Sequence, residues 1–361
     1  MFGLFSKNRK EKIYVAMSGG VDSSVTAALL QQQGYDVTGI YFKTYKPDGN
    51  KEYCMKQGKD AKKVCEQLGI PFKAFDLQEE YKKKVFNYMI SEYKAGRTPN
   101  PDIMCNKNIK FGVFLKKALA DGANMIATGH YARISKHRLL KGVDENKDQS
   151  YFLSQLSKEQ LRHVMFPLGK YKKPKVRKLA ERFGLHTASK KDSQGICFIG
   201  EEINVKDFLK KHIDEKEGDV LNVKGEKIGT HSGAIFYTIG ERHSFKIDPE
   251  YQTSNMPRLF IISKDVNKNT ITIGTQQELE QRGKATLLVK DLNWINNAPK
   301  NNKKYTCRIR HRGKLYKCRT KIVDDSKMNI YLEETPYAPA EGQFAAIYDG
   351  DECLGGGVIT L

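Results

Sequence analysis

The segment "IYVAMSGGVDSSVTAALLQQQG", residues 13–34, decides the fold class of the first part of the chain. An apolar run at 13–17 leads at once into a glycine and serine turn, and then into a helical pattern that stops at Gly34. Glycine commonly ends a helix because it adopts left-handed backbone angles without strain. A strand, a tight turn and a helix in this order indicate an α/β protein.

Strands and helices continue to alternate after this opening. Further strands are expected at 36–42, 71–76 and 124–129, and helices at about 57–68, from 77 to Tyr93 and at about 107–120. Such alternation predicts a doubly wound, mostly parallel sheet. A helix at 174–185, with Pro174 in its first turn, precedes an irregular stretch at 188–200 that ends this domain.

The residue pattern changes along the rest of the chain. Short apolar runs separated by Gly, Asn and Asp begin near residue 218, and strand patterns dominate from about 284, which predicts a small all-β barrel or sandwich. We therefore expect four parts: a flexible tail at 1–12, the α/β domain at 13–205, a small central domain at 206–283 and a β-barrel at 284–361.

The composition limits the possible partners and locations. The net charge is +20, from 62 Lys and Arg against 42 Asp and Glu, which favours a polyanionic partner, although solubility alone could also explain it. No apolar run approaches the ~18 residues of a membrane span, and the first twelve residues lack the apolar core of a secretory signal. We expect a cytoplasmic protein with no membrane partner.

The seven cysteines do not form a recognisable scaffold. Their number is odd, and their spacing is not that of a regular set of disulfides. The chain contains no CxxC pair that would suggest structural zinc. Most of them are expected to be small buried side chains. Cys105 and Cys197 differ because both are expected on polar loops.

The turn "SGGVDSS", residues 18–24, has the composition of an anion-binding loop. Two glycines allow close backbone approach, and the amides at the start of the following helix favour a phosphate group. The turn lacks the Gly-Lys-Ser/Thr of the common P-loop, so hydrolysis of a γ-phosphate is not implied. A plain strand–helix turn is the alternative, but the position after the first strand favours a nucleotide.

A second unusual stretch is "RTPNPDIMCNKNIKF", residues 97–111. Two prolines, a carboxylate at Asp102 and a thiol at Cys105 lie in what reads as a rigid polar loop before a helix. A following helix N-terminus, or Lys107 or Lys110, could favour the thiolate form of Cys105.

Basic residues gather near the C-terminus. Residues 300–321 hold ten Lys and Arg and no Asp or Glu. If this segment is a hairpin, alternation places Arg308, Arg310 and Arg312 on one face, and Lys317, Arg319 and Lys321 likewise, with apolar side chains facing the core. This basic face suits RNA phosphates, and a solvated face is the alternative. A second basic run at 170–178 could also follow RNA.

Several motifs together resemble a known family. The phosphate loop is similar to that of the PP-loop ATP pyrophosphatases, which split ATP into AMP and pyrophosphate. Within that group the chain resembles the bacterial tRNA-specific 2-thiouridylases, in the same order of motifs: AMSGGVDSS, GRTPNPDIMCNKNIKFG, ATGHYAR, KDQSYFL, DSQGICFIG, FYTIGERH and ECLGGGVI. The resemblance covers nearly the whole chain after residue 12.

The resemblance implies an ATP-dependent sulfurtransferase. It would convert uridine at the wobble position of tRNA for Lys, Glu and Gln into 2-thiouridine, using ATP and, as expected for such a nucleotide, Mg²⁺. Cys197 would carry a persulfide, Cys105 would be the second catalytic thiol, and Asp102 would act as general acid or base. The sulfur donor would be a cysteine desulfurase or a sulfur-relay protein.

The resemblance also implies which residues bind ATP and tRNA. We expect no cluster of metal-ligating side chains. ATP contacts are expected at Ala16, Met17, Ser18, Gly19, Gly20, Val21, Asp22, Ser23, Phe42 and Gly129. Contacts with tRNA are expected at Asn100, Pro101, Asp102, His130, Lys147, Asp148, Gln149, Arg310, His311 and Gln343. Phe42 stands where the family commonly has methionine, and His311 stands where it has tyrosine.

Two alternative functions remain open at this point. Another PP-loop ligase, such as an argininosuccinate- or lysidine-forming enzyme, needs no paired cysteines and would resist thiol-blocking reagents. A non-catalytic RNA-binding protein with an inactive nucleotide domain would release no pyrophosphate in response to tRNA.

Overall fold

The computed structural model describes residues 10–46, 51–192, 204–336 and 338–361. The chain forms two compact units, which are described separately. The first contains Met1–Lys82 and Met104–Glu201, and the second contains Lys83–Ile103 and Glu202–Leu361. The segment Lys83–Ile103, from the middle of the expected α/β domain, therefore belongs with the second unit. The four-part division of the chain, with its boundaries at 12, 205 and 283, stays a prediction.

The first unit is built on a parallel sheet. Its strand order is β3-β2-β1-β4-β7, and every neighbouring pair is parallel. The strands are β1 (Lys12–Ala16), β2 (Asp36–Lys43), β3 (Phe72–Asp76), β4 (Met125–Ala127) and β7 (Val164–Met165). The chain runs from β1 outward to β3 and then returns to the other side of β1 with β4. The direction of winding therefore changes between β1 and β4, and in sheets of this kind ligands bind at the carboxyl ends of the strands at such a point.

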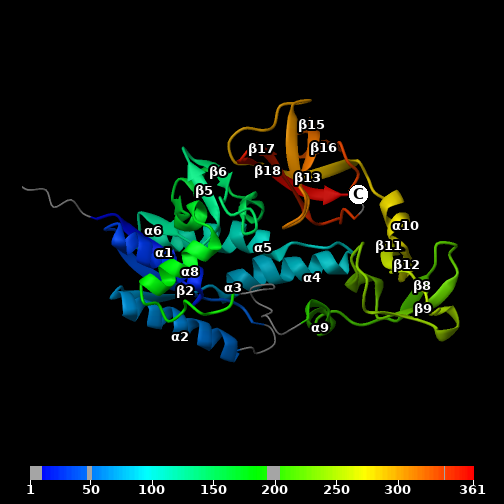
Figure 1. The fold of residues 1–361 in the computed structure, drawn as a ribbon, viewed down its shortest axis with the longest axis horizontal. Helices are drawn as coiled ribbons and strands as arrows, with labels where there is room; N and C mark the ends of the chain where they lie inside the picture. Colours follow the sequence, from blue (N-terminus) through cyan, green and yellow to red (C-terminus); the bar gives the residue numbers. More distant parts are fainter. Residues whose placement is uncertain (1–9, 47–50, 193–203, 337) are drawn as a thin grey trace, which may run out of the picture. The chain divides into compact units, whose positions relative to one another are not determined.

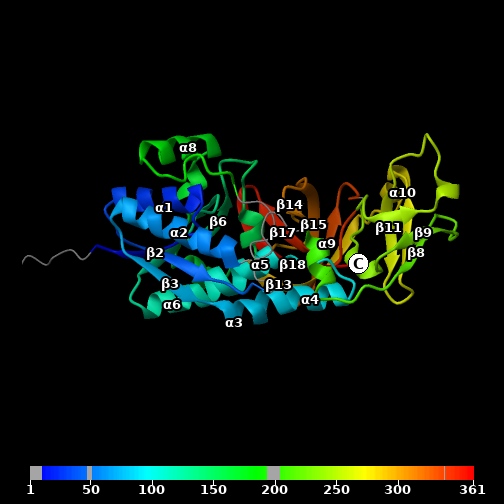
Figure 2. The ribbon, with the colours of Figure 1, turned by 90° about the horizontal axis from the view of Figure 1, so that it is seen from below.

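Helices cover both faces of this sheet (Figure 2). The helical segments of the unit are α1 (Val21–Gln32), α2 (Lys51–Leu68), α3 (Gln78–Tyr81), η2 (Cys105–Val113), α6 (Phe114–Ala120), η3 (Ser150–Leu153), α7 (Lys158–Leu161), η4 (Pro167–Lys170) and α8 (Lys173–Arg182). A hairpin of β5 (Ala132–Ser135) and β6 (Arg138–Lys141) follows β4 and precedes η3 in the sequence (Figure 1). The expected doubly wound α/β fold is confirmed.

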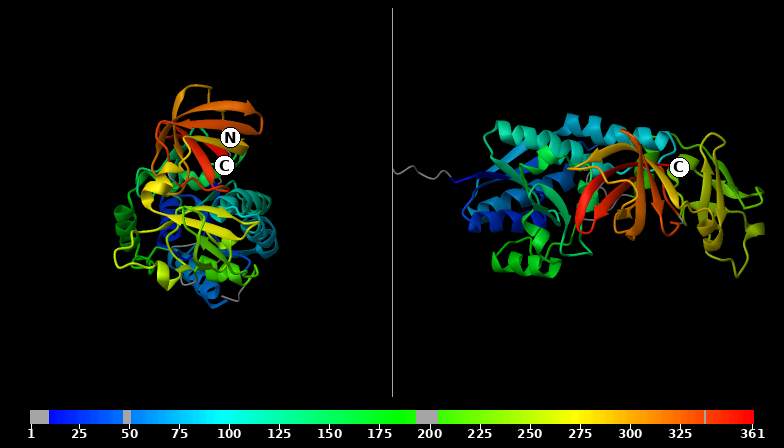
Figure 3. Two further views of the ribbon diagram at one scale, coloured as in Figure 1. Left: turned by 90° about the vertical axis from the view of Figure 1, so that its right-hand side faces the viewer. Right: turned by 90° about the horizontal axis from the view of Figure 1, so that it is seen from above.

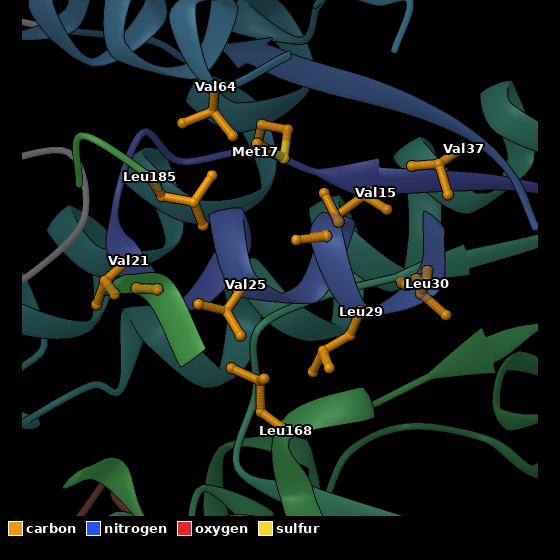
Figure 4. Close-up of a cluster of buried hydrophobic side chains, with 14 of the residues drawn as sticks. Val15, Met17, Val21, Val25, Leu29, Leu30, Val37, Val64, Leu168 and Leu185 are labelled. Atoms are coloured by element: carbon orange, nitrogen blue, oxygen red, sulfur yellow. The ribbon is translucent and has the colours of Figure 1, made fainter. Parts of the chain in front are cut away.

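Alternation along β1 divides the core between the two faces. Val15 belongs to the buried cluster that α1, α2 and α8 form, together with Val25 and Val64 (Figure 4). Tyr14 points to the other face, where its ring lies 6.4 Å from that of Phe75. Successive side chains of a strand point to opposite faces, so a strand buried on both faces is apolar throughout.

One helix starts earlier than the sequence predicts. The helix expected from about 107 begins at Pro101, as α5 (Pro101–Met104), and continues through η2, a π-helix, and α6. Asn100 Oδ1 accepts a hydrogen bond from the amide of Ile103 at 3.1 Å, and proline suits the first helical position because its backbone angle is already helical. The expectation that Cys105 lies on a loop is therefore wrong.

The second unit contains a small mixed sheet with short helices. Its strand order is β10-β9-β8-β12-β11, in which only the β12–β8 pair is parallel. The elements of this part are α9 (Val205–Lys210), β8 (Gly218–Leu221), β9 (Lys227–His231), η5 (Ala234–Phe236), β10 (Phe245–Ile247), η6 (Pro249–Tyr251), β11 (Phe260–Asp265), β12 (Thr270–Gly274) and α10 (Gln276–Gln281). The same unit includes α4 (Asn87–Lys94), while η1 (Lys82–Phe86) joins α3 to α4.

The C-terminal strands form a closed antiparallel barrel, drawn mainly in orange and red in Figure 3. They are β13 (Thr286–Trp294), β14 (Lys304–Arg308), β15 (Tyr316–Asp324), β16 (Lys327–Leu332), β17 (Phe344–Asp349) and β18 (Glu352–Thr360). The order is β13-β16-β15-β14-β17-β18, and β13 also pairs with β18. This pairing removes the exposed edges, and the expected β-barrel is confirmed.

The predicted basic face is only half correct. Along β15, Lys317, Arg319 and Lys321 are exposed and alternate with buried residues, as expected. Strand β14 ends at Arg308, which is only 9% exposed and has its guanidinium 5.8 Å from the centre of the Tyr348 ring. The expectation that Arg308 shares one strand face with the two following arginines is wrong, because the strand does not extend that far.

Candidate active site

The turn between β1 and α1 has the shape of an anion-binding loop. Gly19 has φ of 72°, and a Cβ atom there would lie 2.5 Å from the carbonyl oxygen of Gln57. Both the backbone angle and the lack of space require glycine. Gly20 is the N-cap of α1 and has no side chain to cap the first amides, so the start of this helix can bind an anion.

Serine hydroxyls close this turn on itself. Ser23 Oγ donates to the carbonyl oxygen of Gly20 at 3.1 Å and accepts from the amide of Ser18 at 3.2 Å. Ser24 Oγ donates to the same carbonyl oxygen at 2.8 Å. These bonds hold the turn in one shape before any ligand arrives, which is the preorganisation that phosphate binding needs.

Two further residues expected at the nucleotide site lie on or just after the two strands that flank β1, which are β2 and β4. Gly129 follows β4, and a Cβ atom there would lie 2.9 Å from the carbonyl carbon of Asp22 and 3.0 Å from the amide nitrogen of Ser23. The structure thus brings Gly129 directly against the start of α1. Phe42, near the end of β2, packs on Phe114 with ring centroids 4.6 Å apart. Its expected contact with adenine stays a prediction.

Asp22 is held by two side chains that the sequence interpretation did not identify. Tyr131 donates its hydroxyl hydrogen to Asp22 Oδ1 at 2.7 Å, and Lys173 Nζ lies 2.8 and 2.9 Å from the two carboxylate oxygens. Burial, reinforced by Asp22, raises the pKa of Tyr131 well above its usual value, so the phenol keeps its proton.

Lys173 also joins a second carboxylate. Its ammonium group lies 2.7 Å from Asp192 Oδ1, and Asp192 is further paired with Lys147 at 2.6 Å and Arg177 at 2.7 Å. Burial opposes ionisation of Asp192, but the hydrogen bonds from Lys147 and Lys173 outweigh it and lower its pKa. Asp192 therefore stays charged.

The helical period of residues 173–180 could have shown from the sequence that Lys173 lies on the buried face. On a helix, Lys173, Val176 and Ala180 share one face, and all three are buried. The sequence indicates a basic surface at 170–178 that could follow RNA, but Lys173 is not part of such a surface because it is buried.

The segment with the acid and the thiol is helical. Asp102 lies in α5 and is half-buried, while Cys105 is the first residue of η2 and is 4% exposed. Lys107, one of the two lysines expected to assist the thiolate, has its ammonium group hydrogen-bonded to Gln155 Oε1 at 3.2 Å. Single π-helical segments occur frequently at functional sites. Cys197 lies outside the described residues, so the expected approach of the two thiols stays a prediction.

Within the second unit, Gln343 holds the loop that precedes Asp102. Its Nε2 donates to the carbonyl oxygens of Thr98 at 3.1 Å and Pro99 at 3.0 Å, and its Oε1 accepts from Asn100 Nδ2 at 3.3 Å. The amide of Thr98 also donates to the carbonyl oxygen of Glu341 at 2.8 Å. Gln343 was expected to contact tRNA, and that contact stays a prediction.

His130 lies in an apolar environment. It is 8% exposed, its Nδ1 is 2.6 Å from Thr128 Oγ1, and its ring lies 5.7 Å from that of Phe111 and 5.8 Å from that of Phe166. Burial, followed by the charge of Lys110, lowers the pKa of His130 well below its usual value. The imidazole is therefore neutral near pH 7.

The other residues expected to contact tRNA also have partners inside their own unit. Asp148 is buried and accepts hydrogen bonds from the amides of Gly142 and Ser150, and Gln149 Oε1 accepts from the amide of Tyr131 at 2.9 Å. Arg310 donates to the carbonyl oxygen of Ala338 at 2.5 Å. Their contacts with tRNA, and those of Pro101, Lys147 and His311, stay predictions.

Four of the remaining cysteines are buried, as expected, and the side chain of Cys54 lies outside what the structure describes. Cys65, Cys307, Cys318 and Cys353 are buried. Burial, followed by Glu66, raises the pKa of Cys65 to about 11, and burial, followed by Glu333, raises the pKa of Cys318 to about 12. Thiols with such pKa values are poor nucleophiles near neutral pH.

Among the described residues, no group of three or more His, Cys, Asp or Glu side chains could hold a metal ion. A Mg²⁺ ion that arrives with a nucleotide needs only one or two protein carboxylates because phosphates supply the other ligands. Asp22, within the phosphate loop, fits this requirement.

Among the residues that the structure describes, no helix is long and apolar enough to cross a membrane.

Family models match three segments of the chain. Residues 11–201 match the tRNA methyl transferase HUP domain, residues 206–275 match the tRNA methyl transferase PRC-barrel domain, and residues 284–359 match the aminomethyltransferase beta-barrel domain. These segments leave only short stretches of the chain unmatched.

Curated relatives match over nearly the full length. The tRNA-specific 2-thiouridylase MnmA of Bacillus anthracis is 44% identical over 355 residues, which are 96% of this chain and 94% of that protein. The protein of the same name from Staphylococcus saprophyticus is 43% identical over 360 residues, covering 98% and 96%. Among solved structures, the U34-tRNA thiolase NcsA from Methanococcus maripaludis is 19% identical, with a TM-score of 0.35, and the match covers 57% of this chain and 68% of that chain.

Proposed function

The chain belongs to the family of tRNA-specific 2-thiouridylases, and we propose that it is an ATP-dependent sulfurtransferase that converts the wobble uridine of tRNA into 2-thiouridine. The observation that carries this proposal is the 44% identity over 96% of the chain. The geometry of the phosphate loop supports it, because the turn between β1 and α1 is preorganised for an anion.

The phosphate loop would serve the activation step. The O2 oxygen of uracil is a poor leaving group, and its attack on the α-phosphorus of ATP turns it into a good one while pyrophosphate leaves. The turn at Ser18–Ser23 would hold the pyrophosphate part, with Gly129 allowing close approach. Mg²⁺, held by the phosphates and Asp22, would offset their negative charge.

Two thiols would carry the sulfur. The terminal sulfur of a persulfide on Cys197 attacks C2 of the adenylated base, AMP leaves, and the base is linked through sulfur to Cys197. The Cys105 thiolate then attacks the Cys197 sulfur, which leaves 2-thiouridine and a Cys105–Cys197 disulfide. A dithiol reductant restores both thiols, and Asp102 would act as general acid or base.

The finer assignments rest on the same family membership. The substrates would be the tRNAs for Lys, Glu and Gln, and the persulfide would come from a cysteine desulfurase or a sulfur-relay protein. A tRNA-modifying enzyme with these substrates would act in the cytoplasm.

Mass analysis of nucleosides tests the proposed reaction. Unmodified tRNA is incubated with the protein, ATP, Mg²⁺ and a persulfide donor, and we expect the mass gain of one sulfur for one oxygen on uridine. Reactions without ATP, and reactions with Asp22→Ala, serve as controls and should give no gain. A different adduct would indicate another PP-loop ligase, and tRNA binding without pyrophosphate release would indicate a non-catalytic RNA-binding protein.

A further inference from the structure

The phosphate loop lacks a cation of its own. Residues 18–24 contain serine, glycine, valine and aspartate, and no Lys or Arg. In common P-loops a lysine within the loop reaches the β- and γ-phosphates. Cleavage of ATP between the α- and β-phosphates leaves a highly charged pyrophosphate, and backbone amides alone provide only partial charges against it.

A buried lysine from a distant part of the chain lies beside this loop. Lys173, the first residue of α8, follows Asp22 by 151 positions, and its Nζ is 2.8 Å from Asp22 Oδ1. Asp22 is the second residue of α1, the helix whose N-terminus forms the anion site. Lys173 is 8% exposed, which is rare for lysine unless the charge has a specific role or partner.

The partners of Lys173 allow its ammonium group to turn toward a new anion. If Lys173 leaves Asp192, that carboxylate keeps Lys147 and Arg177. If it leaves Asp22, that carboxylate keeps the hydroxyl of Tyr131. Asp192 would keep two cationic partners, and Asp22 would keep a hydrogen bond and is 33% exposed, so the large cost of leaving a buried charge unpaired is avoided.

The position of Lys173 is fixed independently of its ion pairs. Its backbone amide donates to Asp144 Oδ2 at 2.8 Å, and Val176 and Ala180 of the same helix belong to the buried cluster that includes α1. The backbone thus stays in place beside α1, and only the flexible side chain has to move. A lysine fits this task because its ammonium is a compact charge on a long stem.

We propose that Lys173 is a binding residue for the pyrophosphate part of ATP, and that it replaces the missing lysine of the phosphate loop. Asp22 and Asp192 hold the ammonium beside the loop until the nucleotide binds. This inference rests on the proposed function, because it deepens the assignment of the nucleotide site.

Ligand selectivity separates this role from a purely structural one. ATP and pyrophosphate carry the phosphates that Lys173 would contact, whereas AMP lacks them. In the full-length protein without tRNA, Lys173→Met should weaken binding of both ATP and pyrophosphate roughly ten- to hundredfold, the range expected for one hydrogen bond to a charged group. AMP affinity should change little, because AMP lacks these phosphates. A loss of local structure alone would weaken the binding of AMP as well.

The matched control is Lys178→Met, which changes an exposed lysine of the same helix. Equilibrium dialysis with radiolabelled ATP, AMP and pyrophosphate, together with thermal unfolding, gives the comparison. Lys178→Met should bind all three ligands as the wild type does. Unchanged ATP affinity in Lys173→Met, or an equal loss for ATP and AMP, would overturn the inference.

A second variant keeps the test valid if Lys173→Met does not fold. Lys173→Arg keeps the charge but changes its reach, and it should lower the ratio of ATP to AMP affinity by a smaller factor. An unchanged ratio would also overturn the inference. Failure of the proposed function gives a different result, because a wild-type protein that binds no ATP would exclude the nucleotide site itself.

Discussion

The phosphate loop and the loop before Asp102 both lead into helices, but they are held in opposite ways. The turn at residues 18–20 is closed by Ser23 and Ser24, which lie only a few residues further along the chain. The loop Thr98–Asn100 is held mainly by Gln343, which is 243 residues away from Asn100. Local serine bonds therefore close the first loop, with one distant bond from Lys190 Nζ to the carbonyl oxygen of Gly19 at 2.9 Å, whereas contacts from the folded barrel hold the second.

This difference has a chemical reason. A phosphate site uses backbone amides at a helix N-terminus, and a short motif can arrange these by itself. A general acid or base has to be placed accurately relative to a substrate, and accurate placement needs support from rigid neighbouring elements. Gln343 provides such support because it follows a tight turn at Gly342 and directly precedes β17.

The largest expected effect separates the steps that the two regions perform. Asp22→Ala should abolish tRNA-dependent pyrophosphate release, because it alters the nucleotide site. Cys105→Ser and Cys197→Ser should keep one turnover of ATP but form no 2-thiouridine. Measurement of pyrophosphate and modified nucleoside in a single turnover checks both statements.

Labelling separates the two thiols further. With a ³⁵S donor, Cys105→Ser should still carry label on Cys197, and Cys197→Ser should carry none, because loading needs the accepting thiolate. Non-reducing gels of both variants beside the wild type give the result. Label on Cys197→Ser alone would reverse the two roles, and equal label on both would contradict a division of labour.

A substitution inside the phosphate loop should be nearly as severe. Gly19→Ala introduces a Cβ 2.5 Å from the carbonyl oxygen of Gln57, at a φ of 72° that disfavours alanine. A displacement of the loop by about 1 Å is expected to reduce pyrophosphate release roughly hundredfold. Gly34→Ala is the control, because its φ is 89° but no atom lies within 4 Å of the new Cβ. Equal activity losses in the two variants would show that strain, and not the shape of the loop, causes the effect.

Loss of the support for the second loop should reduce the rate by a smaller factor. Gln343→Leu removes three hydrogen bonds to residues 98–100 and should slow thiolation about tenfold, while ATP affinity stays the same. Single-turnover rates and ATP binding are the measurements. Gln343→Glu, which keeps only the acceptor for Asn100, should lie between Gln343→Leu and the wild type.

The same variants test whether Gln343 touches tRNA instead. A positioning role predicts a lower rate with tRNA affinity nearly unchanged. A large loss of tRNA affinity at an unchanged maximal rate would favour direct contact and would contradict the contrast between the two loops.

The smallest expected effect concerns the basic face of β15. Lys317→Glu combined with Arg319→Glu should weaken tRNA binding several-fold and flatten its dependence on salt, because fewer counterions are released. ATP binding should not change. Filter binding at several salt concentrations measures both quantities, and an unchanged salt slope would mean that this face is only solvated.

Much of the fold follows from local patterns in the sequence. Apolar strands such as residues 13–17 and helices that end at glycine predict the α/β domain, and the alternation in 316–321 predicts a barrel strand. The motif at residues 18–24 predicts the phosphate loop for the same reason, because the serine hydroxyls that close the turn bond to near neighbours.

Other features differ from the sequence-based expectation where a local pattern allows two outcomes. Asn-Pro-Asp at 100–102 predicts a loop, yet Asn100 caps a helix that begins at Pro101. The alternation at 308–312 predicts one strand face that includes Arg310 and Arg312, although β14 ends at Arg308. In both cases the residue types fit a turn and a regular element equally well, and packing decided between them.

The sequence by itself determined the two kinds of fold, the phosphate loop and the presence of an acid and a thiol at residues 102 and 105. Only the tertiary structure placed Lys173 beside Asp22 and Gln343 against the loop at 98–100. The helical period can show that Lys173 lies on a buried face. It cannot show which distant residue Lys173 meets, because such contacts arise when distant elements pack against each other. A buried charge then acquires its partners from whatever that packing brings within hydrogen-bonding distance.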